Sequence, residues 1–235
     1  QDSFANRGFL PAQDPLTQFN LESKFSLLDE VGRDLPSRLL EVDFRRYAES
    51  LTIPEWSDEQ LSLDTLPELR LYFVRLAFLA SAYINQVGQP AIYSLPANLA
   101  VPLTRVASLL SVPPILNYAA YALYNWRRFD KKQGVLLGNI DTIQNFVHLY
   151  DEHWFILVHI EIEAQAAAIL AAVETFHAEN NRVGKISEEL VNTQLQLIAA
   201  CLAQQLRVLK RIPERMSTEL YFKVFRPYIR FFEKV

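Results

Sequence analysis

Several residue types are scarce in this sequence, and each shortage argues against a class of protein. Cys201 is the one cysteine among 235 residues, which excludes an internal disulfide and a cysteine-based zinc site. Glycine occurs six times, and no GxGxxG or GxxxxGK(S/T) motif is present to cradle nucleotide phosphates. The net charge is −4 without any run of four lysines or arginines, so we expect no nucleic-acid partner. The scarcity of cysteine fits a reducing compartment, and we expect a cytoplasmic protein.

Long uncharged apolar runs are also scarce. The segment 69–84 is interrupted by Arg70 and Arg75, and the run 154–168 carries His159, Glu161 and Glu163. Neither supplies the roughly 20 apolar residues that a membrane-spanning helix needs. We therefore predict buried helices here and no membrane partner.

What the sequence does have is apolar residues at helical spacing. It is 50% hydrophobic and 21% charged, enough for a substantial core, and strand-like alternation is nearly absent, so the predicted fold class is all-α. The clearest period lies in 187–212, where apolar residues step by three or four: Val191, Leu195, Ile198, Leu202, Leu206, Leu209 and Ile212. Helical segments are predicted at 26–40, 58–63, 65–86, 103–110, 115–129, 140–150, 154–180 and 187–212.

Prolines and polar stretches suggest the domain organisation. Residues 1–22 mix polar and apolar residues with Pro11 and Pro15, which predicts an extended arm that lies on the body. Residues 131–138 are polar and flanked by glycine, which is typical of a linker. We predict an N-terminal arm and small helical domain over 1–130, and the first part of a larger helical domain over 139–235.

His159 is the most informative residue, because it lies in a run of large apolar neighbours. On a helix, His159 and Glu163 share a face and would suit two metal ligands, but no third ligand stands at a convincing spacing. A hydrogen-bonded core histidine is the simpler interpretation, and from residue types alone both stay open. Arg226, among aromatic residues, is either a surface arginine stacked on a ring or a clamp for a substrate carboxylate. Cys201 lies mid-helix near the apolar stripe, which favours a buried structural thiol over a nucleophile.

Five stretches, in order and spacing, resemble the indoleamine 2,3-dioxygenase family of haem enzymes. They are GFLP with DPL (8–16), LPANLAVPL (95–103), PPILNYAAYALYNW (113–126), WFILVHIEIEA (154–164) and FRPYI (225–229). The resemblance covers nearly the whole chain but only the N-terminal portion of the family. It implies a helical haem-dioxygenase fold, in which a small N-terminal helical domain packs on part of a larger helical domain.

The resemblance also implies a reaction and a set of site residues. The family binds haem b and inserts both atoms of O2 across the indole C2–C3 bond of L-tryptophan, giving N-formylkynurenine in the kynurenine pathway of tryptophan catabolism. By position, His159 matches the distal residue that orients the indole, and Arg226 matches the arginine that pairs with the substrate carboxylate. The remaining matches are wall or pocket residues: Tyr118, Tyr121, Phe155 and Tyr221. Tyr121 stands where relatives often have a smaller residue, which implies a reshaped cavity.

The family's proximal histidine, the axial ligand of the iron, belongs to a C-terminal portion outside these residues. His148, His153 and His177 do not match it, so we expect no metal ligand in this chain and a C-terminal fragment of the same protein as a partner. Two alternatives stay open. One is a haem enzyme of the same superfamily that acts on a tryptophan derivative by monooxygenation or rearrangement; the other is a non-catalytic helical binding protein.

Overall fold

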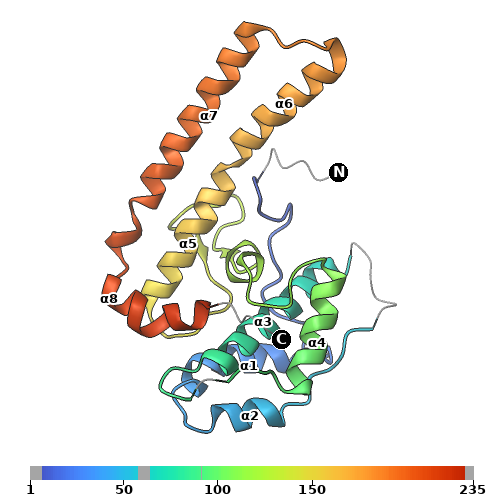
Figure 1. Cartoon of the computed structure of the whole chain (residues 1–235), viewed down its shortest axis with the longest axis vertical. Helices are drawn as coiled ribbons and strands as arrows, with labels where there is room; N and C mark the ends of the chain where they lie inside the picture. Colours follow the sequence, from blue (N-terminus) through green and yellow to red (C-terminus); the bar gives the residue numbers. More distant parts are fainter. Residues whose placement is uncertain (1–6, 58–63, 91, 231–235) are drawn as a thin grey trace.

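Helices dominate the computed structural model, which describes residues 7–57, 64–90 and 92–230 (Figure 1). The α-helices are α1 (Leu27–Arg38), α2 (Phe44–Ser50), α3 (Leu66–Asn85), α4 (Ala97–Leu109), α5 (Tyr150–Gln165), α6 (Ala167–Val183), α7 (Glu188–Leu209) and α8 (Thr218–Leu220). Shorter helical turns are η3 (Ala119–Leu123), η4 (Ile212–Glu214), η5 (Tyr221–Phe225) and η6 (Arg226–Ile229). The all-α prediction missed a small antiparallel ribbon, β1 (Arg127–Arg128) paired with β2 (Ile140–Asp141).

Helix α3 is the centre of the core, as its apolar residues on every face predicted. Fourteen of its residues are buried, from Leu69 to Tyr83, and it packs against α1, α2, α4, η3 and η6. Pro67 lies in the first turn, where the missing N–H costs nothing. The buried Arg75 guanidinium bonds to Asp29 at 3.0 Å, to Gln144 at 2.6 Å and to the Thr17 carbonyl. These bonds satisfy a charge that would otherwise be costly to bury, and they tie the arm and α1 to the core.

The described part of the N-terminal arm lies on the body, as predicted, with Leu10 and Phe19 buried. Asp14 accepts hydrogen bonds from both Arg7 and Arg128, which fastens the arm beside β1. Gly8 has φ of +62°, and a Cβ there would lie 2.0 Å from the Glu163 carbonyl oxygen. Glycine is therefore required both for the backbone conformation and for the close approach of the arm to α5.

The predicted helix 154–180 begins earlier, at Tyr150, and is divided at Ala166 into α5 and α6. The Ala166 N–H is shared between the carbonyls of Ile162 and Glu163, both at 3.2 Å. Side chains of α7 bond to carbonyls at this break: the Cys201 thiol donates to Gln165 and the Gln205 amide to Ile162. Cys201 is only half-buried, so the predicted buried thiol is instead a hydrogen-bond donor at the break.

Helices α6 and α7 form a hairpin that extends away from the body (Figure 1). Gly184 ends α6 in the left-handed conformation, and the Ser187 hydroxyl caps α7 by accepting from the Leu190 N–H, at the predicted start. Among the residues of these two helices, Ala172 and Val208 alone are buried. The predicted apolar stripe of α7 is therefore largely open to solvent, and four of its leucines are 43–53% exposed: Leu195, Leu202, Leu206 and Leu209.

Three other predicted helices were also wrong in extent. The segment 103–110 is part of α4, which begins at Ala97 and contains Pro102, because burial of Leu99, Leu103 and Val106 outweighs one lost hydrogen bond. The segment 115–129 is helical only in η3, and 140–150 has no helix before Tyr150. Asn125 explains both, since its buried side chain bonds to the backbone of Tyr121, Ile143 and Gln144 in place of regular helix bonds. The segment 58–63 lies outside the described residues.

The predicted linker, 131–138, lies in the loop between β1 and β2. Leu137 is 9% exposed, and its N–H donates to the Glu161 carboxylate at 2.7 Å, which fixes this end of the loop to α5. Apolar residues from both sides of the loop belong to one continuous core. The division into domains at this loop stays a prediction.

One segment of the described chain, Tyr150–Val183, is long and apolar enough to cross a membrane by length and composition alone. A buried helix passes the same test, and 39% of its most apolar window is buried inside the protein. Within it, α5 packs against α7 and η3 and buries the carboxyl groups of Glu152 and Glu161, both hydrogen-bonded to backbone. The absence of a membrane partner stays a prediction.

Candidate functional site

A cavity of about 220 Å³ opens beside α5. It is lined by residues from three parts of the chain: the segment around η3, the middle of α5, and the turns η5 and η6. All six residues that the sequence pointed to line it: Tyr118, Tyr121, Phe155, His159, Tyr221 and Arg226. Ala122, Ile156 and Ile229 complete the lining, so the wall is mainly apolar with a few polar groups.

His159 is half-buried in the cavity wall, so it is not a core residue. Its Nδ1 lies 2.7 Å from the Phe155 carbonyl oxygen, which accepts but cannot donate. Nδ1 therefore carries the proton, and in the neutral ring Nε2 is left as a hydrogen-bond acceptor. The rings of Phe155 and Tyr118 pack around the imidazole, with centroids 4.6 and 6.3 Å away.

Glu163 pairs with Tyr118 and not with His159. Its carboxylate accepts a hydrogen bond from the Tyr118 hydroxyl at 2.8 Å, and no group of three potential ligands occurs in the described part of the chain. Burial and the Glu163 carboxylate raise the pKa of Tyr118, so its hydroxyl stays protonated and donates. Glu161 turns the other way, to the Leu137 N–H and to Gln165. Both glutamates are structural partners.

Tyr121 is the most buried polar residue of the cavity. It is 5% exposed, and its ring stacks on Phe78 with centroids 5.7 Å apart. Its hydroxyl has no hydrogen-bond partner among the described residues, and burial raises its pKa. Because a buried unpaired hydroxyl is costly, this atom is suited to a polar group of a ligand.

Arg226 and Tyr221 close the other side of the cavity. The π-helical turn η5 begins at Tyr221, whose ring packs on Phe155 with centroids 5.2 Å apart. Arg226 donates to the Ile229 carbonyl at 3.0 Å, and no carboxylate of the described chain pairs with it. The rest of the guanidinium is therefore available to an anionic group in the cavity.

A known protein family matches the chain over nearly its whole length. The model of the family "Indoleamine 2,3-dioxygenase" matches residues 3–234. The chain belongs to this family. It is 31% identical over 231 residues to an indoleamine 2,3-dioxygenase of Saccharomyces cerevisiae, covering 95% of this chain and 50% of that protein.

Two mammalian relatives match the chain with similar identity and coverage. Indoleamine 2,3-dioxygenase 1 of Rattus norvegicus is 29% identical over 200 residues, covering 85% of this chain and 47% of that protein. Indoleamine 2,3-dioxygenase 2 of Homo sapiens is 27% identical over 229 residues, covering 89% of this chain and 55% of that protein. The chain thus spans about half the length of the curated relatives it matches, which agrees with the predicted N-terminal portion.

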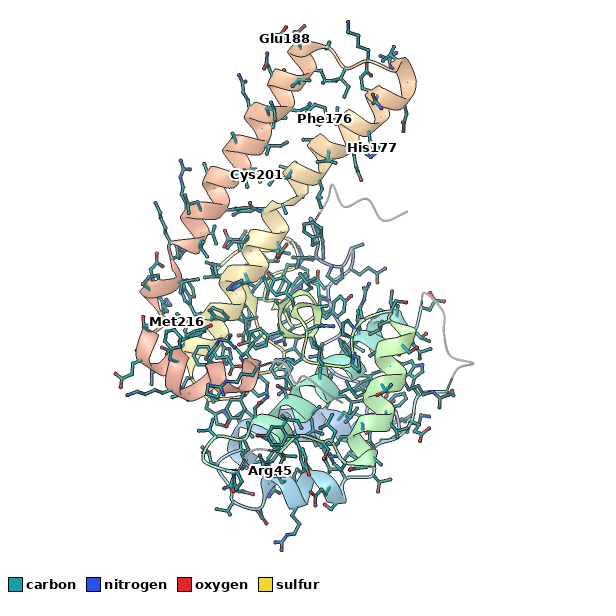
Figure 2. The ribbon with its side chains drawn as sticks, in the orientation of Figure 1. Arg45, Phe176, His177, Glu188, Cys201 and Met216 are labelled. Carbon is teal, nitrogen blue, oxygen red and sulfur yellow. The ribbon has the colours of Figure 1, made fainter. Side chains whose placement is uncertain are left out.

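The resemblance to indoleamine dioxygenases implies haem, whose iron needs a protein ligand such as a histidine. The cavity wall is mainly apolar, and His159, which the resemblance assigns to the substrate side, is the one histidine of the described chain that lines it. His148 bonds to Ser37 and His153 to Asp141, both at 3.0 Å, and His177 lies on α6 far from the body (Figure 2). Apart from His159, the histidines of the described chain therefore stand away from this cavity and do not suit an iron ligand there.

Glu152, which is not part of the cavity lining, was not predicted from the sequence. It is fully buried, and its carboxyl accepts from the N–H groups of Phe146 and Val147 at 2.9 Å. Burial raises its pKa to about 8, although these hydrogen bonds oppose the shift. The bonds fix Phe146, whose ring stacks on Tyr228 with centroids 5.0 Å apart. No spacing in the sequence reveals this role, because the contact depends on the irregular loop before α5.

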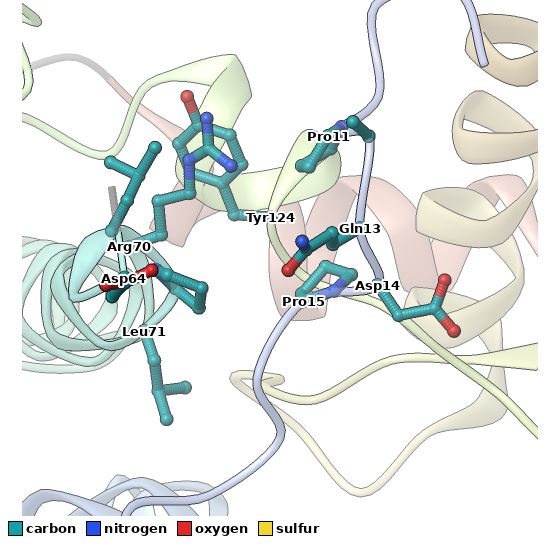
Figure 3. Close-up of a pocket in the computed structure, with 11 residues that line it drawn as sticks. Pro11, Gln13, Asp14, Pro15, Asp64, Arg70, Leu71 and Tyr124 are labelled. Carbon is teal, nitrogen blue, oxygen red and sulfur yellow. The ribbon is translucent and has the colours of Figure 1, made fainter. Parts of the chain in front are cut away.

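A separate cavity of about 270 Å³ lies between the arm and the start of α3 (Figure 3). Pro11, Gln13 and Pro15 form one side, and Arg70 forms the other, with its guanidinium 4.8 Å from the centroid of the Tyr124 ring. No residue that the sequence singled out for the site lines it. It is distinct from the cavity beside α5.

Proposed function

We propose that this chain forms the substrate side of a haem-dependent indoleamine dioxygenase. The reaction inserts both atoms of O2 across the indole C2–C3 bond of L-tryptophan or a related indole and gives N-formylkynurenine. The observation that carries the proposal is the convergence of the six predicted residues, from three separate segments, on one cavity. Family membership supports the same reaction class.

His159 orients the substrate in this proposal. Haem b, when bound, supplies the oxygen chemistry. Because Nδ1 donates to the Phe155 carbonyl, Nε2 accepts the hydrogen bond of the indole N–H and sets the angle of the ring. The Tyr118–Glu163 hydrogen bond braces the ring that packs on the imidazole.

The other cavity residues bind two parts of the substrate at separate places, the indole and the amino-acid group. Phe155, Tyr121 and Ile156 exclude water from the indole. Arg226, which has no carboxylate partner in the described chain, binds the substrate carboxylate, and the Tyr221 ring packs beside it. A bound haem would take its iron ligand from the part of the family's length that this chain does not span. We also propose that the enzyme acts in the cytoplasm.

The test uses the complete, haem-loaded, reduced protein with L-tryptophan and measures N-formylkynurenine by absorbance. Arg226→Ala is expected to raise KM roughly 10- to 100-fold, because a charge-assisted pair to the carboxylate is lost. His159→Ala is expected to lower kcat/KM by a similar factor, whereas the exposed His177→Ala is the control and leaves it unchanged. Binding of tryptophan without turnover would instead favour the non-catalytic binding protein.

One observation favours a second candidate, in which the substrate is a tryptophan derivative that is monooxygenated or rearranged. The unpaired Tyr121 hydroxyl suits an indole that bears a polar substituent. The comparison is kcat/KM for ring-hydroxylated against unsubstituted tryptophan. If the protein prefers the hydroxylated ring and Tyr121→Phe removes this preference, the result supports the derivative. If Tyr121→Phe leaves the ratio of the two kcat/KM values unchanged, the result favours tryptophan itself.

A further inference from the structure

The outer face of α7 is unusual for a helix in water. No charged residue stands between Glu189 and Arg207. Within this region and just beyond it, four exposed leucines are spaced by seven, four and three residues, so they share one face: Leu195, Leu202, Leu206 and Leu209. A solvated helix face normally carries Lys, Glu or Arg.

The side of α7 next to these leucines has a different character. The side of α7 that contacts α5 carries Cys201 and Gln205, which donate to the carbonyls of Gln165 and Ile162 at the α5–α6 break. Val208 is the one residue of α7 that is buried, whereas the four leucines are left exposed. This arrangement is unfavourable for the chain alone, unless another surface covers the leucines.

The chemistry of this face indicates a protein partner. Its leucines are accompanied by uncharged polar side chains such as Asn192 and Gln196, and the centres of protein interfaces are likewise depleted of charge. A helix that lies on a membrane carries Lys or Arg along its polar face, and here basic residues begin only at Arg207.

The length of the relatives identifies the partner. The chain covers 50% of the yeast relative and 47% of the rat relative, so about half of each relative lies outside the matched region and packs with the rest of that protein. We infer that the outer face of α7 is the surface on which that remaining half packs, and that the α6–α7 hairpin becomes interior in the complete fold. The inference rests on family membership and not on the proposed reaction.

The experiment co-expresses this chain with the polypeptide that follows the matched region in the Saccharomyces cerevisiae relative. Light scattering after size exclusion measures the complex. The expected result is a 1:1 complex, and Leu202→Glu with Leu206→Glu lowers capture at least tenfold. The matched control is Leu40→Glu with Val101→Glu, two exposed apolar residues of the body, 85% and 51% exposed, and it captures as the unmodified chain does.

A second readout covers variants that fail to fold. Amide hydrogen exchange of the unmodified complex is expected to show protection gained over 195–209. Failure of the unmodified chain to form the complex, equal capture by the α7 variant, or no gain of protection in α7 would overturn the inference. Two further results would also overturn the inference: formation of a homodimer by the chain alone, or binding of the chain to phosphatidylserine vesicles, if the α7 substitutions abolish it. Because no outcome depends on turnover, failure here is distinguishable from failure of the proposed reaction.

Discussion

Helices α3 and α7 are alike in length and leucine content and opposite in burial. They have 20 and 22 residues and are both rich in leucine, yet fourteen residues of α3 are buried against one of α7. α3 is surrounded by α1, α2, α4, η3 and η6, whereas α7 contacts α5 and α6 along one side. Apolar periodicity thus predicts that a helix forms, but burial depends on which partners the chain itself supplies.

The difference also separates a stable body from a less stable extension. The body includes the cavity beside α5 and carries nearly all the buried apolar area of the described chain. The α6–α7 hairpin is fixed at its base, where Cys201 and Gln205 bond to α5. We expect the hairpin to open locally without unfolding the body.

A truncation in α3 should give the largest effect. Leu76 is 1% exposed, so Leu76→Ala leaves a cavity in the core and lowers the free energy of unfolding by about 2–5 kcal/mol. Chemical denaturation of the chain measures it. A loss below about 1 kcal/mol would mean that α3 is not the centre of the core.

A substitution at the junction of the two regions should have the next effect. Gly8→Ala places a Cβ against the Glu163 carbonyl and strains a residue with positive φ, so a loss of about 1–3 kcal/mol is expected. Limited proteolysis should also cleave the released arm sooner. Gly88→Ala is the control for φ alone, since it too has positive φ but has no atoms near the added Cβ.

The pH dependence of stability should depend on the buried Glu152 of the body and not on an exposed glutamate of α7. Its pKa is about 8 in the folded chain and near 4.5 when unfolded, so folding takes up a proton between these values. The free energy of unfolding therefore falls as the pH rises from 4.5 towards 8. Glu152→Gln should flatten this dependence, and Glu188→Gln on the exposed start of α7 is the control. An unchanged slope in Glu152→Gln would assign the pH dependence elsewhere.

The smallest effect is expected on α7. Leu202 is 52% exposed, so Leu202→Ala should change the free energy of unfolding of the isolated chain by less than about 0.5 kcal/mol. The same chemical denaturation compares it directly with Leu76→Ala. A loss as large as that of Leu76→Ala would show that α7 already has a buried partner in the chain alone.

Sequence patterns predicted α1, α3 and α7 to within about three residues, because caps, prolines and period mark their ends locally. They failed from 115 to 150, where Asn125 replaces helix hydrogen bonds through tertiary contacts. The six site residues were predicted by resemblance and converge on one cavity, although their roles stay predictions. The unpaired Tyr121 hydroxyl and the buried Glu152 could not be predicted, since both depend on packing between distant segments.

Amide hydrogen exchange of the isolated chain tests the contrast between α3 and α7 most directly. The account predicts that amides of α3 exchange only through global unfolding, and that amides of 195–209 in α7 exchange on the order of a hundredfold faster or more through local opening. Equal protection of α3 and α7 would contradict it, because the hairpin would then be as firmly packed as the core.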